Sequence, residues 1–368
     1  MPRTRETVLE IDLKALTHNY RFLRSRLHSE TKFLAVVKAF AYGSDSIRIA
    51  QRLEALGIDY LAVAYVAEGI ALRDAGIKTP ILVLHPQSVN FDIMIAHYLE
   101  PSLYAPRILK EFLEALKKHN QKDYPVHIKF NTGLNRLGFW ENDVDFILDQ
   151  VKGKNDVKIV SIFSHLAASE DLNEKGFTQS QIESFKKIAS EVNQKLECSP
   201  IRHLLNTSGI INYPEAQFDM VRCGIGLYGF GNEAKIDKQL KPIATLKTII
   251  SQIHRIEPGE TVGYNRAFTS QSYRVTATLP LGHADGIGRH YGNGKAFVKI
   301  NGKIAPIIGN VCMDMLMIDI TGIECKEGDE VIVFGQDPSA EKFASTANTI
   351  SYELLTGISQ RVKRIFME

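Results

Sequence analysis

Along the first two thirds of the chain, short apolar runs alternate with stretches in which apolar residues recur every three or four positions. Short continuous apolar runs are typical of strands buried on both faces, and the wider spacing is typical of amphipathic helices. The helix-like segments 46–56 and 67–75 are closed by Gly57 and Gly76, which suit the left-handed residue that ends a helix. We expect eight strands, at 32–38, 59–64, 80–84, 99–103, 125–131, 157–163, 202–206 and 218–222.

This alternation predicts a closed (β/α)8 barrel of the TIM type, because parallel strands need helical crossovers and eight such units can close a sheet. An open, doubly wound sheet is the alternative. Before the barrel, residues 7–12 alternate like a half-buried strand, and Asp12 can cap the helix that follows. Because this strand precedes the barrel, it is a candidate to pair with a second domain.

After about residue 235 the helical spacing stops and short alternating runs take its place. Turn signals such as Pro258-Gly259 and Asn301-Gly302 separate these runs, and one helix is expected near 344–356. We therefore expect two domains, an N-terminal barrel at 1–235 and a mostly-β C-terminal domain at 236–368. The expected β runs are 243–254, 273–280, 296–308, 315–320 and 330–334.

Composition and charge exclude several classes of partner. A net charge of +2 over 368 residues gives no reason to expect nucleic acid or an anionic membrane surface. No apolar run is long enough to cross a bilayer, and the basic start, residues 1–5, is not followed by the apolar segment of a signal peptide. The four cysteines lack metal-ligand or disulfide spacing, so we expect no metal and a reducing cytoplasm. They are Cys198, Cys223, Cys312 and Cys325.

The first barrel strand runs from Phe33 to Val37 and leads directly into Lys38. Burial disfavours the charged ammonium, so it lowers the pKa of such a lysine and makes the amine a usable nucleophile and base. The chemistry that most needs this is a Schiff base with a carbonyl, above all with pyridoxal 5′-phosphate (PLP). The alternative is a lysine whose stem lies on apolar surface while its head reaches water.

Other strand ends supply more polar residues, and in this barrel the carboxyl ends of all strands meet at one mouth. Cationic groups predominate there, so we expect an anionic ligand to compensate them. The turns after strands seven and eight form the usual phosphate site of the fold. The residues concerned are Lys129, Arg136, His165, His203, Asn206, Thr207, Ser208 and Arg222.

In their joint order and spacing, these stretches resemble the alanine racemases, which are fold-type III PLP enzymes. The resemblance covers essentially the whole chain. It is carried by Ala35–Gly43, Lys129–Gly138, Phe163–His165, Asn206–Ser208, Met220–Gly229, Val262–Tyr264, Gly282–Gly286, Cys312–Asp314 and Thr349–Glu353.

The resemblance implies two catalytic bases on opposite faces of the substrate Cα. Lys38 would hold PLP as a Schiff base and act on one face, and Tyr264 would act on the other. A base on one face cannot return a proton to the other, and a phenol with a pKa near 10 needs surroundings that lower it. In the family this tyrosine comes from the partner subunit, so a homodimer with shared sites is implied. Met313 would contact the substrate, with Cys312, Asp314 and His283 as supporting residues.

The resemblance also implies how PLP is held. Arg222 would face the pyridine nitrogen without giving up its proton, His165 would pack on the ring, and His203 would support Arg222. Arg136 would bind the substrate carboxylate or the PLP phenolic oxygen. Lys129 would be carbamylated, as in some relatives, and would orient Arg136. The phosphate and its surroundings would be bound by Tyr42, Asn206, Thr207, Ser208, Gly224, Ile225 and Tyr352.

Several positions depart from the family pattern. None of them removes a base or the cofactor lysine. Asn131 replaces an aspartate near Arg136 and so weakens the case for a carbamate. His283 replaces a phenol near the site entrance. The others are Phe40 for Asn, Ser44 for His and Cys223 for Pro.

The implied activity is the interconversion of L-alanine and D-alanine, an amino-acid isomerisation that would supply D-alanine for peptidoglycan. A racemase of broader specificity, for serine or lysine, is the nearest alternative, because the sequence does not define the pocket volume. A fold-type III decarboxylase normally places an acidic residue opposite the pyridine nitrogen, and Arg222 speaks against it. A non-catalytic PLP-binding carrier resembles the barrel alone. A phosphosugar-binding barrel without PLP is the last alternative.

Overall fold

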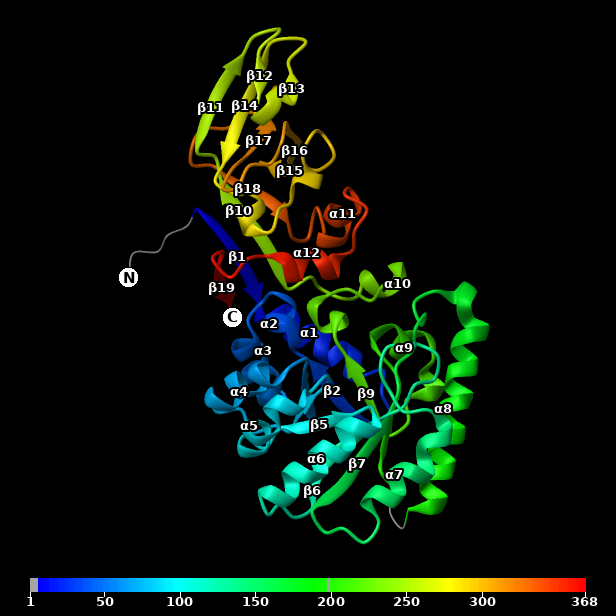
Figure 1. Ribbon diagram of the computed structural model, residues 1–368. Helices are drawn as coiled ribbons and strands as arrows, with labels where there is room; N and C mark the ends of the chain where they lie inside the picture. Colours follow the sequence, from blue (N-terminus) through cyan, green and yellow to red (C-terminus); the bar gives the residue numbers. More distant parts are fainter. Residues whose placement is uncertain (1–5, 197–198) are drawn as a thin grey trace. The chain divides into compact units, whose positions relative to one another are not determined.

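The computed structural model describes residues 6–196 and 199–368 (Figure 1). Cys198 and the basic start of the chain lie outside this range. The described residues form two compact units. The barrel unit comprises Thr17–Ala41 and Ser46–Leu240, and the β unit comprises the residues up to Leu16 together with Tyr42–Asp45 and Lys241–Glu368.

The barrel unit is built on eight parallel strands that close on themselves. Closure is made by the first and last strands, whose Cα register aligns Leu34 with Arg222. The prediction of a closed (β/α)8 barrel is therefore confirmed. The strands are β2 (Lys32–Val36), β3 (Tyr60–Val63), β4 (Ile81–Val83), β5 (Glu100–Leu103), β6 (Tyr124–Lys129), β7 (Val157–Phe163), β8 (Ile201–His203) and β9 (Met220–Cys223).

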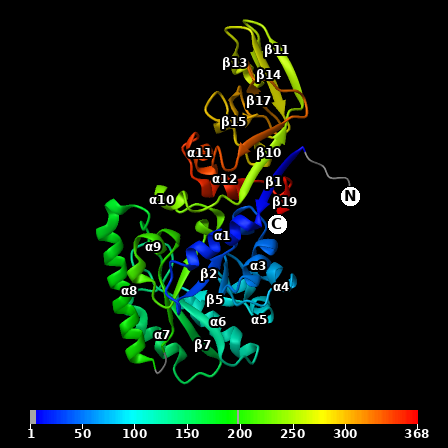
Figure 2. The ribbon, with the colours of Figure 1, turned by 180° about the vertical axis from the view of Figure 1, so that it is seen from behind.

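Helices surround the barrel, and the views from the two sides show them outside the strands (Figures 1 and 2). In α6 the apolar stripe predicted by a three-to-four spacing is buried, at Ile108, Phe112 and Leu116 among others. The α-helices are α1 (Leu13–Arg24), α3 (Ser46–Ala55), α4 (Val66–Asp74), α5 (Phe91–Ala96), α6 (Pro106–Lys118), α7 (Val144–Val151), α8 (Lys175–Lys195), α9 (Thr207–Asn212) and α10 (Ala234–Asp237). Short 3-10 turns are η1 (Ser88–Asn90), η2 (Glu141–Asp143), η3 (Leu172–Glu174), η4 (Pro214–Ala216) and η5 (Ile225–Tyr228).

The β unit is organised around a nine-stranded sheet in the order β11-β14-β17-β16-β15-β18-β10-β1-β19. A two-stranded ribbon, β12–β13, accompanies it. This mostly-β unit agrees with the predicted fold class. Its strands are β1 (Thr7–Asp12), β10 (Ala244–Ile249), β11 (Gln252–Ile256), β12 (Thr261–Val262), β13 (Phe268–Thr269), β14 (Arg274–Leu279), β15 (Phe297–Ile300), β16 (Lys303–Ile308), β17 (Leu316–Asp319), β18 (Glu330–Phe334) and β19 (Lys363–Met367).

The first strand of the chain belongs to this sheet. β1 pairs antiparallel with β10 and parallel with β19, so the two ends of the described chain lie side by side. After β1, the Asp12 Oδ1 atom accepts the Ala15 N–H at 2.8 Å and caps α1, as the sequence predicts. The pairing with β19 has no signal in the sequence.

The predicted single helix near 344–356 is wrong. Two short helices, α11 (Ala340–Ser345) and α12 (Ser351–Gly357), occupy this region, and Asn348 between them has a left-handed φ of 56°. A left-handed residue interrupts a right-handed helix, which explains the break. The unit also contains the 3-10 turns η6 (Tyr264–Arg266), η7 (His283–Asp285) and η8 (Arg289–Tyr291). Within residues 6–196 and 199–368, no helix has both the length and the apolarity needed to span a membrane.

Candidate active site

The lysine that follows the first barrel strand begins an unusual turn. The segment α2 (Lys38–Tyr42) is left-handed, with φ between 51° and 54° at Ala39, Phe40, Ala41 and Tyr42. Left-handed backbone costs an L-residue roughly 1–2 kcal/mol, so four in succession require support from their surroundings.

Glu68, the third residue of α4, supplies part of that support. Its Oε1 accepts the Ala39 N–H at 2.6 Å, while Oε2 accepts the N–H groups of Ala64 at 2.7 Å and Tyr65 at 3.1 Å. One carboxylate therefore joins the left-handed turn to the start of α4, and it does so beside Lys38.

The half-buried Lys38 amine is easier to deprotonate than an ordinary lysine. Its pKa is lowered, first by burial and then by the positive charge of Arg136, and the negative charge of Glu68 opposes this only in part. A larger fraction of the amine is therefore neutral near pH 7, which is the form that attacks a carbonyl or accepts a proton.

A second lysine lies in the same electrostatic environment. Lys129, at the end of β6, is buried, and its pKa falls to about 7, first through burial and then through the charges of Arg136, Arg222 and Lys38. Within the described part of the chain its amine has no acidic partner, and its Nζ lies 5.9 Å from the centroid of the Phe163 ring. Arg136 is exposed and likewise has no acidic partner there. The structure thus brings together a cluster of cationic groups, in which the Glu68 carboxylate acts on Lys38 but Lys129 and Arg136 have no acidic partner among the described residues.

Arg222 on β9 is buried and is held by several acceptors. Its Nη1 donates to His203 Nδ1 at 2.7 Å and to the His203 carbonyl at 3.1 Å. Its Nη2 donates to the Ser164 carbonyl at 2.6 Å, the Leu204 carbonyl at 3.0 Å and His165 Nδ1 at 3.1 Å. Its Nε–H has no acceptor among the described residues. A buried guanidinium with one uncommitted donor is set up to bind an acceptor from outside the chain.

The two histidines next to Arg222 are neutral. The pKa of each is well below the usual value, first because of burial and then because of the charge of Arg222. His203 is fully buried and stacks on Phe163 with ring centroids 4.7 Å apart and an interplanar angle of 9°. The pKa of Arg222 itself is lowered to about 9 by burial and by Arg136, so it remains protonated at pH 7.

The turns after β8 and β9 are drawn together by one hydroxyl. Thr207 Oγ1 accepts the N–H groups of Gly224 and Gly226, both at 3.3 Å. A Cβ on Gly226 would lie 2.7 Å from Thr207 Cγ2, so the backbone can approach this closely only at glycine. The main-chain N–H groups of Ser208 and Ile225 have no acceptor in the described chain. These donors suit a phosphate.

Further contacts complete this region. Asn206 caps α9, with its Oδ1 accepting the Gly209 N–H at 2.9 Å and the Ser169 hydroxyl at 2.7 Å. The Ser208 hydroxyl accepts from Asn232 Nδ2 at 3.2 Å. The Oδ1 atom of Asn206 therefore holds the turn in place from within the protein.

The other candidate residues belong to the β unit. There the η7 segment is strapped to the loop before β17: His283 N–H donates to the Cys312 carbonyl at 2.9 Å, and Ala284 N–H donates to the Met313 carbonyl at 3.0 Å. A Cβ on Gly282 would stand 2.3 Å from the Met313 carbonyl oxygen, so glycine is required there. The side chains of Met313 and Asp314 are exposed on this loop.

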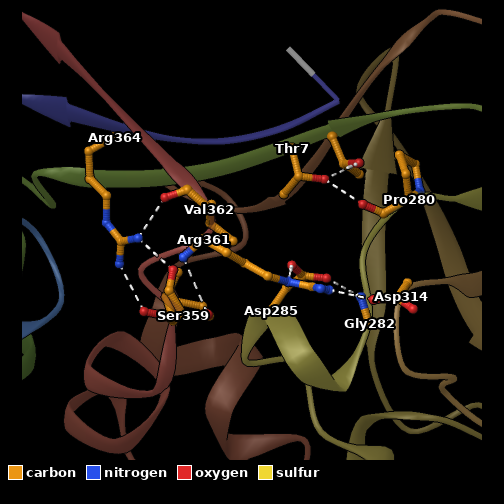
Figure 3. Close-up of polar contacts among 11 residues, drawn as sticks. Thr7, Pro280, Gly282, Asp285, Asp314, Ser359, Arg361, Val362 and Arg364 are labelled. Carbon is orange, nitrogen blue, oxygen red and sulfur yellow. Dashed lines mark hydrogen bonds and ion pairs between the residues drawn. The ribbon is translucent and has the colours of Figure 1, made fainter. Parts of the chain in front are cut away.

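An ion-pair network holds the same loop (Figure 3). Arg361 Nε donates to Asp285 Oδ1 at 2.7 Å and Arg361 Nη2 to Asp314 Oδ1 at 2.8 Å, while Asp285 Oδ2 accepts the Gly282 N–H at 2.8 Å. Arg361 therefore joins the segment before β19 to both η7 and the Met313 loop.

The tyrosines predicted for the site also lie in the β unit. Tyr264 is 69% exposed, and its carbonyl accepts from Asn310 Nδ2 at 3.0 Å. The rings of Tyr42 and Tyr352 lie 6.0 Å apart. The structure thus gathers the predicted residues in two groups, one in each unit. The barrel group is Lys38, Lys129, Arg136, His165, His203, Asn206, Thr207, Ser208, Arg222, Gly224 and Ile225; the β-unit group is Tyr42, Tyr264, His283, Cys312, Met313, Asp314 and Tyr352.

Sequence reasoning missed several polar residues of the barrel. Glu68 has no Ser, Thr, Asp or Asn three positions before it to mark a capping box. His127 and Ser161 stand inside apolar strands, where polar residues at inward positions are a signal that was available. Glu100 opens β5 and also lacks any motif.

A lysine with a lowered pKa, a buried arginine and N–H groups without acceptors among the described residues lie at the mouth of this parallel barrel, an arrangement typical of barrel enzymes that bind an anionic cofactor. Family models agree: residues 11–231 match the alanine racemase N-terminal domain and residues 243–366 match the C-terminal domain. The chain belongs to the alanine racemase family, a family of amino-acid isomerases.

Individual relatives span the whole chain. The alanine racemase of Thermodesulfovibrio yellowstonii is 38% identical over 366 residues, with 97% of each chain covered. The alanine racemase structure of Clostridium difficile 630 has a TM-score of 0.93 at 33% identity, covering 100% of this chain and 97% of that one. The structure of the Bartonella henselae alanine racemase with covalently bound pyridoxal phosphate has a TM-score of 0.89 at 29% identity, covering 98% and 99%.

Proposed function

We propose that this protein is a PLP-dependent racemase that interconverts L-alanine and D-alanine. The observation that carries the proposal is the buried Arg222, whose Nε–H has no acceptor among the described residues while its other N–H groups are bound within the barrel. A donor left over in such a place fits an aromatic nitrogen acceptor. The pyridoxal phosphate in the Bartonella henselae relative supports the same cofactor here.

The residues present fit this cofactor. Lys38 would anchor it through Nζ, Arg222 would donate to its ring nitrogen, and His165 would pack on its ring. The N–H groups of Ser208 and Ile225 would bind its phosphate, together with Gly224 and Thr207 and with Tyr42 and Tyr352 from the β unit. When bound, PLP withdraws electrons from the Cα of the amino acid and so makes the Cα proton easier to remove.

Two bases would move that proton. Lys38 Nζ accepts it on one face, for which its lowered pKa is suited. Tyr264 Oη acts on the opposite face. Because Tyr264 is largely exposed in the single chain, we propose that it works in the site of a partner subunit within a homodimer. Met313 and Asp314 belong to the same unit as Tyr264, and they would lie on a loop that Arg361 holds through its ion pair with Asp314.

Arg222 would also govern the outcome of the reaction. A guanidinium with a pKa of about 9 stays protonated at pH 7, so it donates a hydrogen bond and keeps its proton. Because it keeps its proton, Arg222 would leave the ring nitrogen unprotonated. Arg222 would thereby favour prompt return of the proton to Cα over side reactions such as transamination.

Arg136 would bind the substrate carboxylate or the phenolic oxygen, since a guanidinium fork suits both. We propose that Lys129 carries a carbamate. Its pKa of about 7 leaves a neutral amine to react with CO2, with release of one proton to solvent, and the carbamate would place a negative charge near Arg136 and Arg222 in addition to that of Glu68 near Lys38. Asn131, in place of the family's aspartate, adds no charge of its own.

We assign the barrel domain to 1–235 and the β domain to 236–368, with β1 added to the second. D-alanine made in the cytoplasm would serve peptidoglycan synthesis.

The experiment that tests the function is chiral chromatography of L-alanine, L-serine and L-lysine after incubation with the protein and PLP, with Lys38→Ala as control. We expect D-alanine to form fastest and to approach an equal mixture, and Lys38→Ala to form none. If D-serine or D-lysine forms faster than D-alanine, the protein is a racemase for that amino acid instead. The absence of any D-amino acid from untreated protein would overturn the proposal if borohydride treatment of a separate portion of the same protein fixes PLP on Lys38.

A further inference from the structure

A chain of hydrogen bonds crosses the barrel interior below Arg222. Glu100 Oε2 lies 2.6 Å from His127 Nε2, and His127 Nδ1 lies 2.6 Å from the Ser161 hydroxyl. The same hydroxyl lies 2.9 Å from His203 Nε2, and His203 Nδ1 lies 2.7 Å from Arg222 Nη1. Four side-chain contacts therefore connect a carboxylate to the arginine of the proposed site.

The strand register shows that this series of hydrogen-bonded side chains runs toward the carboxyl ends of the barrel strands. His127 and Ser161 are aligned neighbours on β6 and β7, and His203 is aligned with Phe163, two residues further along β7. Arg222 lies two residues beyond Met220, the residue aligned with His203. Because residues two apart in a strand share a face, the steps from Ser161 to His203 and from His203 to Arg222 each move one layer toward the carboxyl ends of the strands, whereas His127 and Ser161 lie in the same layer.

Donor and acceptor counting gives the chain a single direction. Arginine only donates, so His203 Nδ1 is an acceptor and the ring proton is on Nε2. His203 then donates to Ser161 Oγ, and the Ser161 hydrogen must go to its other partner, His127 Nδ1. His127 therefore carries its proton on Nε2 and donates it to Glu100, which only accepts as a carboxylate. The arginine at one end only donates and the carboxylate at the other end only accepts, so both require these hydrogen bonds to run in the same direction.

Burying these polar side chains destabilises the folded state unless each of them has its hydrogen-bond partners. His127, Ser161 and His203 are fully buried, and 11% of the Glu100 side chain is exposed. Buried polar groups without partners destabilise a core, whereas a complete network orders its members and polarises them along its length. The pKa of the nearby Tyr60 phenol is raised, first by burial and then by the Glu100 charge, so this phenol stays protonated.

We propose that Glu100 is a positioning residue for the site: through His127 and Ser161 its carboxylate holds His203 in the acceptor tautomer, which orients Arg222 so that its Nε–H faces an aromatic-nitrogen ligand. The ligand in this statement rests on the proposed function. The orientation of the five side chains does not. Nothing in this chain of contacts touches the reacting atoms, so Glu100 acts only through its neighbours.

Two variants and one matched control test the proposal. Glu100→Gln removes the charge but keeps an oxygen that can accept from His127. Ser161→Ala interrupts the chain at its middle. Ser102→Ala is the control, because Ser102 lies on β5, is fully buried, and has a hydroxyl without a partner among the described residues. It therefore removes a buried hydroxyl from the same barrel interior and leaves the chain intact.

The first readout uses the protein without substrate. Solid-state 15N spectra of protein labelled at the histidine ring nitrogens distinguish protonated from unprotonated nitrogens. We expect His127 and His203 both to be neutral with the proton on Nε2. We expect Glu100→Gln and Ser161→Ala to shift the His203 signals and Ser102→Ala to leave them unchanged. A doubly protonated His127, or His203 protonated on Nδ1, would overturn the proposal.

The second readout is kinetic and spectroscopic. We expect Glu100→Gln and Ser161→Ala to lower kcat about tenfold in both directions with KM changed less than about threefold, and to shift the absorption band of bound PLP. Ser102→Ala should stay within about twofold of the native protein. Kinetics and spectra of both variants that match the control would refute the role of Glu100. Native ring-nitrogen spectra with the expected tautomers in a protein that racemises nothing would instead refute the proposed function alone.

Discussion

Replacing Glu68 by glutamine tests whether this side chain holds the turn that carries Lys38. The carboxylate accepts three main-chain N–H groups through two oxygens, from Ala39, Ala64 and Tyr65. Glutamine has one acceptor oxygen, so its NH2 group must face at least one of those N–H groups. Either Ala39 or the pair at the start of α4 then loses its acceptor.

The magnitude follows from the number and exposure of these bonds. A hydrogen bond to a charged group contributes about 1.5–3 kcal/mol, and an unsatisfied buried donor costs about 1–3 kcal/mol. Ala39 and Tyr65 are exposed, so water replaces part of what is lost. We therefore expect Glu68→Gln to lower the free energy of unfolding by about 2 kcal/mol. The variant also loses the carboxylate that connects the left-handed turn to the start of α4, so this turn is less well supported.

Asp143→Asn is the matched control, because Asp143 accepts a single N–H, that of Trp140 at 2.8 Å, at the start of η2. Its replacement keeps an acceptor oxygen, so we expect a loss below about 1 kcal/mol. Urea unfolding measures both variants. In addition, the Glu68 charge opposes the lowering of the Lys38 pKa, so Glu68→Gln should lower that pKa further, seen as faster PLP capture by the apoprotein at lower pH. Equal stabilities for Glu68→Gln and Asp143→Asn would refute the reasoning.

Three further predictions follow from the described contacts. Tyr264→Phe should keep PLP bound but lose racemisation, chiefly by blocking proton removal from the L-enantiomer; near-normal rates in both directions in a chiral assay would contradict this. In CO2-free buffer the free energy of unfolding should rise between about pH 7 and 10. In this pH range the Lys129 amine is protonated in the unfolded chain but largely neutral in the folded protein, where its pKa is about 7. Urea unfolding at a series of pH values measures this rise, and Lys129→Met should make it smaller. Gly282→Ala should lower Tm by several degrees, since its Cβ would stand 2.3 Å from the Met313 carbonyl oxygen. Gly357→Ala is the control, because nothing lies within 4 Å of its Cβ position and, as at Gly282, the backbone is not left-handed; equal Tm values for the two variants would contradict the steric argument.

The carbamate proposed on Lys129 has its own measurement. Protein equilibrated with 13C-bicarbonate should give a carbamate signal in the native chain and none in Lys129→Met. A plain amine in the native chain would refute the modification and leave the cationic cluster to be neutralised by bound ligands.

The barrel and its order of strands were accessible to sequence reasoning because burial on both faces leaves a local trace. A parallel strand must be apolar throughout, and each crossover helix must carry an apolar stripe, so the eight strands and helices such as α3 and α4 could be located from pattern alone. Lys38 stood out for the same reason, as a charge directly after an apolar run. The residues around it were identified as a set only through the resemblance to the alanine racemases.

The tertiary structure decided what depends on contacts between distant positions. The left-handed turn after Lys38 is not encoded in Ala39, Phe40 or Ala41, none of which favours that backbone; the surroundings impose it, Glu68 among them. The pairing of β1 with β19 joins segments some 350 residues apart, and no local pattern records it. The line of side chains from Glu100 to Arg222 draws one member from each of five strands, and only closure of the barrel aligns them. A sequence determines where apolar surface must be buried, whereas the direction of a hydrogen bond depends on which donor and acceptor the fold finally places within reach.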